Sequence, residues 1–182
     1  TGGVAAEWIP IKPKTDAAFL YGVIHRILIE RNWREICDVE RLEQDSNSPY
    51  LIGPNGYWMR DPETEKPLIF DLEDETAKPF DTDIQRPGME GKFTVSGIEI
   101  GADEDRWVHD KIQVTTSFQK LIDQMKEYTP EWAQEQSDVP ADRIRTVADE
   151  FITNACVGQT IEVEGEEMPF RPVAILLGKT VN

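Results

Sequence analysis

The apolar residues near the start of the chain recur at helical spacing. Between Thr15 and Arg31 the positions that share one side of a helix are Phe19, Leu20, Val23, Ile24, Ile27 and Leu28. A stripe of this width is typical of a helix that packs one face against a core. Thr15 or Asp16 is placed to cap the N-terminus of that helix. The pattern therefore predicts a helix that runs to about Arg31.

The same spacing predicts four further helices. One covers residues 33–44, and three follow later, at 116–127, 130–136 and from about 138 to 151. Thr129 offers a capping side chain, Pro130 suits the first helical position, and Glu131 places an acid in the first turn. These flanking residues support the helix that begins at Pro130.

The residues from 48 to 116 have a different character, with many Pro, Gly and Asp residues between short apolar runs. Residues 50–52 and 56–60 flank the sequence Pro54-Asn55-Gly56, which favours a hairpin turn. Further strands are predicted at 67–71, 92–100 and 110–114. We interpret residues 48–116 as a β-rich insert within a single domain that covers residues 1–182.

Apolar segments near both ends predict strands at 7–13 and 173–177. Since helices lie between them, we expect these two strands to be parallel in one sheet, which gives an α/β fold. A small hairpin is predicted at 158–168, around Glu164-Gly165. The chain opens with Thr1 and stops soon after an apolar run, so we expect it to be an internal piece of a longer protein.

The formal net charge of −16 is large for 182 residues. Such a balance opposes binding to a phosphate backbone, so nucleic acid is not an expected partner. The acidic residues concentrate at 61–83 and 162–167, where we interpret them as a solvated surface. They lack the spacing of a calcium-binding loop. No apolar run is long enough to predict insertion into a membrane.

The cysteines and histidines are too few and too dispersed to form a metal site by themselves. Cys37 and Cys156 are far apart in sequence, and neither forms a CxxC or Cys/His pair with His25 or His109. A zinc or iron–sulfur site needs four clustered ligands. The sequence therefore predicts no metal ligand and no catalytic residue in this chain.

The turn formed by Lys14, Thr15 and Asp16 is the best candidate for chemistry. It joins a predicted strand to the start of a long helix, where backbone N–H groups are unsatisfied and attract polar ligands. The carboxylate of Asp16 has two possible roles: it caps its own helix, or it accepts paired hydrogen bonds from a planar donor edge such as that of guanine. Local reasoning leaves both open. Gly178-Lys179-Thr180 is similar to the end of a P-loop, but Val173 stands where that motif needs glycine.

Four segments, in the same order, resemble the molybdopterin oxidoreductases of the dimethyl sulfoxide reductase family. Residues 8–18 resemble the family's I-x-P-G-T-D-x-A run, with Lys14 at the glycine position. Residues 60–71 resemble its R-D-P-x-x-G-K-P-L-x-x-D stretch, and residues 128–145 its Y-T-P-E-x-A and V-P-A-x-x-I-R helices. Residues 171–174, leading to Gly178, are similar to a strand that returns toward the cofactor.

The resemblance implies a Rossmann-like nucleotide-binding portion of a molybdenum oxidoreductase. It assigns the guanosine end of a molybdopterin guanine dinucleotide to Lys14, Thr15 and Asp16, and a loop near the cofactor to Gly178 and Lys179. It also implies that the iron–sulfur cysteines and the molybdenum ligand precede this segment, and that the second dinucleotide-binding half follows it. The isolated chain is then expected to be inactive.

The resemblance implies two partners, an electron-transfer subunit and the remainder of the catalytic subunit. The sequence leaves open whether the whole protein belongs to a bacterial or archaeal periplasm or to the cytoplasm. An alternative interpretation is a free-standing acidic α/β module for protein interaction, without catalytic activity. In that case Asp16 is a plain helix cap and the β-rich insert is the surface for a partner.

Overall fold

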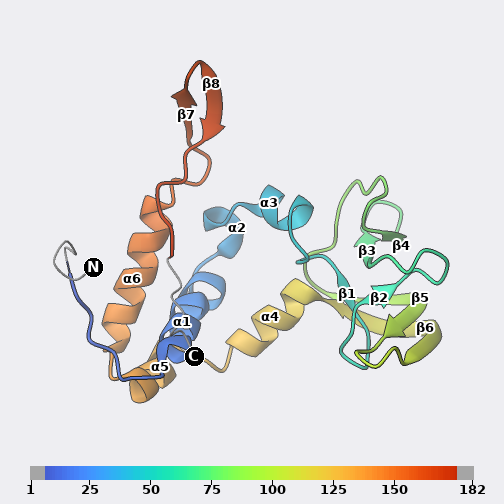
Figure 1. Cartoon of the computed structure of the whole chain (residues 1–182), viewed down its shortest axis with the longest axis horizontal. Coiled ribbons are helices and arrows are strands. Elements are labelled where there is room, and N and C mark those ends of the chain that lie inside the picture. The colour runs from blue at the N-terminus through green and yellow to red at the C-terminus, as the bar shows by residue number, and fades with distance from the viewer. Residues whose placement is uncertain (1–6, 176–182) are drawn as a thin grey trace. The chain divides into compact units, whose positions relative to one another are not determined.

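The computed structural model describes residues 7–175. The chain divides into two compact units, each with its own core. The first unit contains Thr1–Asp38 and Gln124–Asn182, and the second contains Val39–Asp123. The second unit is therefore inserted between two segments that fold together. Figure 1 shows the elements of both units in chain order.

The first unit is built around three helices. α1 (Asp16–His25) continues without a break into a π-helical turn, η2 (Arg26–Glu30), so the predicted helix to about Arg31 is confirmed. α1 packs on α5 (Pro130–Ser137) and on α6 (Ala141–Asn154). The buried core between them consists of Val23, Ala133, Val139, Ile144 and Ala148.

Gly22 permits the close packing of α1 on α5. A Cβ atom at this position would lie 2.7 Å from the Cβ of Ala133 and 3.1 Å from a methyl group of Ile144. Real Cβ contacts as short as the first essentially do not occur, so a side chain here would force the helices apart. Adding even a methyl group to a packed core costs free energy, because the surrounding atoms must shift. Glycine is therefore required by packing rather than by its backbone freedom.

The start of α5 follows the sequence prediction closely. Thr129 is the N-cap, and its hydroxyl oxygen accepts a hydrogen bond of 3.1 Å from the backbone N–H of Trp132. Pro130 occupies the first turn, where its missing N–H costs nothing. The helix ends at Ser137, and the C-cap residue Asp138 has a left-handed backbone. Local chemistry alone thus sets both ends of α5.

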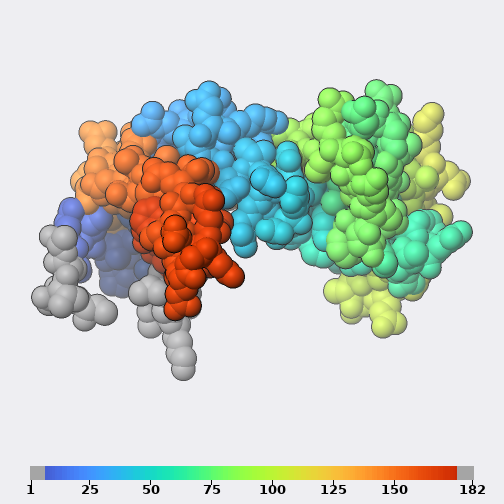
Figure 2. Space-filling model, turned by 90° about the horizontal axis from the view of Figure 1, so that it is seen from above, coloured from blue at the N-terminus to red at the C-terminus, as the bar shows by residue number. Residues whose placement is uncertain are grey.

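The predicted helix over 33–44 is divided. α2 (Trp33–Ile36) and α3 (Val39–Gln44) are separate, because Cys37 adopts an extended conformation after one turn. After α6, the predicted hairpin is confirmed as β7 (Thr160–Val163) and β8 (Glu166–Pro169). Glu164 and Gly165 have positive φ angles of 53° and 88°, as a two-residue hairpin turn needs. Both strands are exposed along their length (Figure 2).

The second unit is a curled antiparallel sheet with a small additional hairpin. The sheet has the strand order β1-β6-β5-β2, formed by β1 (Leu51–Ile52), β2 (Met59–Arg60), β5 (Lys92–Ile100) and β6 (Arg106–Thr116). β3 (Leu68–Asp71) pairs with β4 (Thr76–Pro79). α4 (Ser117–Met125) continues directly from β6. The core of this unit is formed by Leu51, Met59, Leu68, Phe70, Val95 and Val114.

Two buried carboxylates hold the loops of the second unit. Glu99 accepts hydrogen bonds from the backbone N–H groups of Asn55 and Tyr57 and from the Asn55 side chain, and it also contacts Nε2 of His109 at 2.9 Å. Asp71 accepts hydrogen bonds from Nζ of Lys78 and from three backbone N–H groups, those of Glu73, Gln85 and Arg86. The N–H groups of an irregular loop lack the carbonyl partners that a helix or sheet provides. Each carboxylate accepts hydrogen bonds from such N–H groups.

The prediction of parallel strands is wrong for the part of the chain that the structure describes. Every strand pair within residues 7–175 is antiparallel. Residues 7–13 and 173–175 form no strand, and residues 176–177 lie outside the described range. The N–H of Lys12 donates to the carbonyl of Ser137 at the end of α5, so this segment is held by a helix end instead of a neighbouring strand. The mixture of helices and strands is confirmed, while the Rossmann-like pairing is not found there.

Candidate cofactor-binding turn

The turn before α1 has a left-handed backbone at Lys14. The φ angle of Lys14 is 68°, a conformation that glycine adopts without strain and that other residues adopt only at some cost. The N–H of Thr15 donates to the carbonyl of Lys12 at 3.3 Å, and the Thr15 hydroxyl donates to the same oxygen at 2.6 Å. These two bonds close the chain into a tight turn. Lys14 therefore occupies a position where glycine would be the unstrained residue.

The first turn of α1 has no side-chain cap. Thr15 occupies the N-cap position, but its hydroxyl is bound to Lys12, and its side chain accepts from none of the helix N–H groups. Asp16 is the first helical residue, and within residues 7–175 its carboxylate has no hydrogen bond or ion pair. Within the described residues the Asp16 carboxylate makes no hydrogen bond to its own helix, and its oxygens have no donor there.

The surroundings of the turn are polar and partly exposed. Lys12, Pro13 and Lys14 are exposed, whereas Thr15 and Asp16 are half-buried. Ile9 and Ile11 pack against the core of the first unit and hold the approach to the turn. The arrangement presents an acidic acceptor, unsatisfied backbone N–H groups and two lysines within a few residues. Such a set is suited to a ligand with a planar donor edge and a negatively charged part.

The second predicted cofactor contact, Gly178 and Lys179, lies outside the described residues. The structure therefore brings together Lys14, Thr15 and Asp16, as neighbours in one turn. Within residues 7–175, no group of three or more His, Cys, Asp or Glu residues has the arrangement of a metal site. None of the helices in that range is long and apolar enough to cross a membrane.

The helices behind the turn are joined by an ionic network that the sequence analysis did not anticipate. The guanidinium of Arg26 makes a fork of 3.2 and 2.9 Å with the carboxylate of Asp149, and it contacts Glu30 at 2.8 Å. Arg145 contacts Glu30 at 2.7 Å and Glu131 at 2.7 Å. Hydrogen bonds from Arg145 hold the pKa of Glu30 below its usual value. The network fixes α6 against the end of the first helix.

Residues from the segments that resemble family motifs occupy structural positions in this network and elsewhere. Glu131 and Arg145, from the two helices of the third segment, contact each other directly. Asp71 is buried and holds a loop, and hydrogen bonding by Lys78 keeps its pKa well below the usual range. The side chain of Arg171 donates to the carbonyls of Cys156, Gln159 and Phe170. These residues are accounted for by folding, while Asp16 is not.

The two histidines also have structural partners. Nδ1 of His25 donates to the carbonyl of Met125 at 2.7 Å in a buried position, and His109 contacts Glu99. Cys37 and Cys156 are free cysteines. Burial raises the pKa of the Cys37 thiol, which disfavours the reactive thiolate. Cys37 is thus accounted for by burial, and the two histidines by their hydrogen-bond partners.

No model of a known protein family matches the chain. The chain is similar to a sulfite dehydrogenase subunit of Allochromatium vinosum, with 33% identity over 158 residues. That alignment covers 81% of this chain and 15% of the relative, so the chain spans a small part of the relative's length. The similarity relates this chain to a segment of an oxidoreductase subunit.

Proposed function

We propose that this chain is part of the catalytic subunit of a molybdenum oxidoreductase of the dimethyl sulfoxide reductase family. In this role it binds the guanosine portion of a molybdopterin guanine dinucleotide. Lys14, Thr15 and Asp16 form the contact, with Gly178 and Lys179 contributing from the C-terminal end. The observation that carries the proposal is the turn at Lys14 with the unpartnered carboxylate of Asp16 beside it, within the described residues.

The donor and acceptor set of the turn fits this ligand. A guanine base presents a ring N–H and an exocyclic amine side by side, and a carboxylate accepts from both. The left-handed Lys14 is exposed at the point where the family's motif has glycine. The 33% identity with a sulfite dehydrogenase subunit supports the oxidoreductase setting. When bound, the cofactor would supply two-electron chemistry at molybdenum, while this chain would hold its nucleotide end.

The proposal extends to the remainder of the protein. The rest of the catalytic subunit would complete the nucleotide-binding portion around the turn at Lys14, Thr15 and Asp16. It would also supply the molybdenum ligand and the iron–sulfur cysteines, and an electron-transfer subunit would pass electrons to or from it. The isolated chain would then hold a cofactor edge without turning over a substrate.

The test uses the complete protein that contains this chain, purified with its cofactor. Acid hydrolysis should release GMP in a fixed ratio to molybdenum. Asp16→Ala should lower the GMP and molybdenum contents together, since the loss of charge-assisted hydrogen bonds of about 1.5–3 kcal/mol weakens binding by roughly ten- to a hundredfold. Asp16→Asn, which keeps the side-chain shape and one acceptor oxygen, should have an intermediate effect.

A matched control is Glu127→Ala, because Glu127 is exposed in the same unit and outside the turn. That variant should retain the cofactor content of the unmodified protein. The proposal would be overturned if the complete protein releases no guanine nucleotide. It would be overturned equally if Asp16→Ala retains the full content. A molybdenum-free protein that binds another polypeptide through residues 39–123 would favour the interaction module instead.

A further inference from the structure

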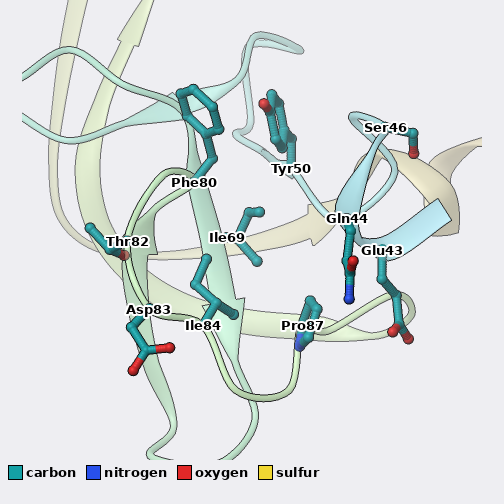
Figure 3. A pocket seen from close by; sticks show the side chains of 10 residues that line it. All are labelled: Glu43, Gln44, Ser46, Tyr50, Ile69, Phe80, Thr82, Asp83, Ile84 and Pro87. Carbon is teal, nitrogen blue, oxygen red and sulfur yellow. The ribbon is translucent and has the colours of Figure 1, made fainter. Parts of the chain in front are cut away.

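The second unit contains a pocket of about 310 Å³ that the proposed cofactor turn does not involve. Its lining comes from the end of α3, the residue before β1, strand β3 and the loop after β4. Figure 3 shows these side chains around a central hollow: Glu43, Gln44, Ser46, Tyr50, Ile69, Phe80, Thr82, Asp83, Ile84 and Pro87. All ten residues belong to the unit that covers Val39–Asp123. The volume is in the range of natural ligand sites.

One side of the pocket is aromatic and its floor is aliphatic. The rings of Tyr50 and Phe80 have centroids 5.7 Å apart, and Phe80 remains 43% exposed. Ile69, from the core strand β3, is buried. Figure 3 shows Ile69, Ile84 and Pro87 in the middle of the lining. These surfaces can cover a flat group and an apolar stem.

The remaining sides are acidic and polar. Glu43 stands at the end of α3, across the hollow from Asp83 of the loop (Figure 3), and no Lys or Arg lines the pocket. Oδ1 of Asp83 accepts from the Gln85 side chain, and Oδ2 has no hydrogen bond within the described residues. The amide oxygen of Gln44 and the hydroxyl oxygen of Thr82 add acceptors, while the Thr82 hydroxyl donates its proton to the carbonyl of Pro79.

The electrostatic field around the pocket is negative. Residues 39–123 contain 19 Asp and Glu residues but nine Lys and Arg residues. Among these, Lys66 is already paired with Asp81 at 2.5 Å. Burial, together with the charge of Asp81, raises the pKa of Tyr50, which keeps this phenol neutral. A positively charged ligand is therefore favoured, and a second copy of this chain, at −16, is disfavoured.

We propose that this pocket binds the side chain of an arginine presented by another polypeptide. A guanidinium is flat, always charged and weakly hydrated, and it stacks on aromatic rings while its edge donates to several acceptors. The aromatic pair, the carboxylates and the polar side chains meet each of these requirements. A lysine ammonium has no planar face and gains less from the same walls. The pocket is thus a recognition site for a basic segment of a partner.

The test is a titration of the 182-residue chain with N-acetyl-arginine-N′-methylamide, followed by methyl and aromatic NMR signals. Saturable shifts are expected at Ile69, Ile84 and Tyr50, with a dissociation constant on the order of millimolar for so small a ligand. The citrulline analogue, which has nearly the same shape without the charge, should bind at least about tenfold more weakly. Equal binding of the two compounds would overturn the proposal.

Two variants separate the pocket from the general acidity of the chain. Asp83→Asn should weaken arginine binding by about two- to fivefold, which is the range for a partly exposed ion pair. Asp103→Asn removes the same charge at an exposed position in the β5–β6 turn and should leave binding unchanged. Ile84→Trp should abolish the shifts by filling the pocket while the signals of the first unit stay in place. Equal losses in Asp83→Asn and Asp103→Asn, or binding retained in Ile84→Trp, would contradict the assignment.

Discussion

Glu30 and Arg145 lie 115 positions apart and form a two-point ion pair, with Nη2 of Arg145 at 2.7 Å from Oε1 and its Nε at 2.9 Å from Oε2. Both side chains are largely withdrawn from solvent, with exposed fractions of 21% and 26%. Paired hydrogen bonds between charged groups are stronger than neutral ones, and partial burial reduces their screening by solvent. This contact joins the end of the first long helix to α6, and we expect the stability of the first unit to depend on it.

Arg145→Ala should destabilise the first unit by about 1–3 kcal/mol, because it leaves Glu30 partly buried without its main donor. Glu131 meets the same guanidinium but is 61% exposed, so Glu131→Gln should cost less than about 1 kcal/mol. Urea unfolding of the chain, followed by tryptophan fluorescence and by amide signals of α6, measures both. A larger effect of Glu131→Gln than of Arg145→Ala would show that the half-buried pair is not the important one.

Lys14→Gly tests the left-handed turn. Glycine adopts a φ angle of 68° freely, which offsets the entropy that glycine adds to the unfolded chain. We expect the free energy of unfolding of Lys14→Gly to lie within about 0.5 kcal/mol of that of the unmodified chain, or to exceed it by up to about 1 kcal/mol. Lys12→Gly, at an exposed position in the same segment that has no positive φ, should lower it. Equal losses in the two variants would argue against a strained Lys14.

The low pKa of Asp71 predicts that the second unit loses stability in acid. Its folded pKa is held low by the Lys78 hydrogen bond, which outweighs the opposing effect of burial, and by three backbone donors. The stability from this group is present above its ordinary pKa of 3.8, and it is lost as the pH falls toward the lower folded value. The urea concentration at which half of the unmodified chain is unfolded should therefore decrease when the pH is lowered below about 4.

The Asp71→Asn variant should be less stable than the unmodified chain at neutral pH, and its stability should depend less on pH. The plots of stability against pH for the two proteins should therefore converge in acid. Asp103→Asn provides the control, since Asp103 is exposed and holds no loop. Its curve should run parallel to that of the unmodified chain. If Asp71→Asn keeps the full acid dependence, other carboxylates are responsible for it.

Gly53→Ala should disrupt the turn that Glu99 holds. A Cβ atom at Gly53 would lie 2.3 Å from the carboxyl carbon of Glu99, which is fully buried and has no room to withdraw. We expect a loss of about 1–3 kcal/mol from this overpacking, together with faster hydrogen exchange at the amides of Asn55 and Tyr57. Gly158→Ala is a comparison without a steric contact, because no atom lies within 4 Å of a Cβ there; its φ of 84° makes alanine strained, so it should lose stability while exchange at Asn55 stays unchanged. Unchanged exchange at Asn55 in Gly53→Ala would contradict the packing argument.

Several features that depend on neighbouring residues were predictable from the sequence, although the single helix expected over 33–44 is divided at Cys37. The stripe from Phe19 to Leu28 and the cap at Thr129 each contain their own signal, and both are confirmed. The turn at Glu164-Gly165 is likewise confirmed, because its two residues tolerate positive φ angles. β4 was missed, since Thr76–Pro79 has little apolar character and its pairing with β3 is supported by the contact between Asp71 and Lys78.

The features that depend on distant residues could not be read in the same way. Nothing near Glu99 indicates that its acceptors serve a turn 42 to 44 positions away, and nothing near Arg26 identifies Asp149. The parallel strands were predicted from the apolar pattern alone, and this pattern does not determine whether a segment pairs with a neighbouring strand. For the candidate site, the sequence located the turn at Lys14–Thr15–Asp16, and the guanosine contact stays a prediction.

The insertion of residues 39–123 between the two halves of the first unit affects the order in which the two units can fold during synthesis. α1 ends at His25, but its partner α5 begins only at Pro130. At a synthesis rate of roughly 5–20 residues per second, the N-terminal helix waits roughly 5–20 seconds on the ribosome for the surface that covers its apolar face. The second unit, which is continuous in sequence, can fold during that interval. The turn at Lys14, whose approach is held by Ser137 and by the core around α5 and α6, can thus form only after α6 has emerged from the ribosome.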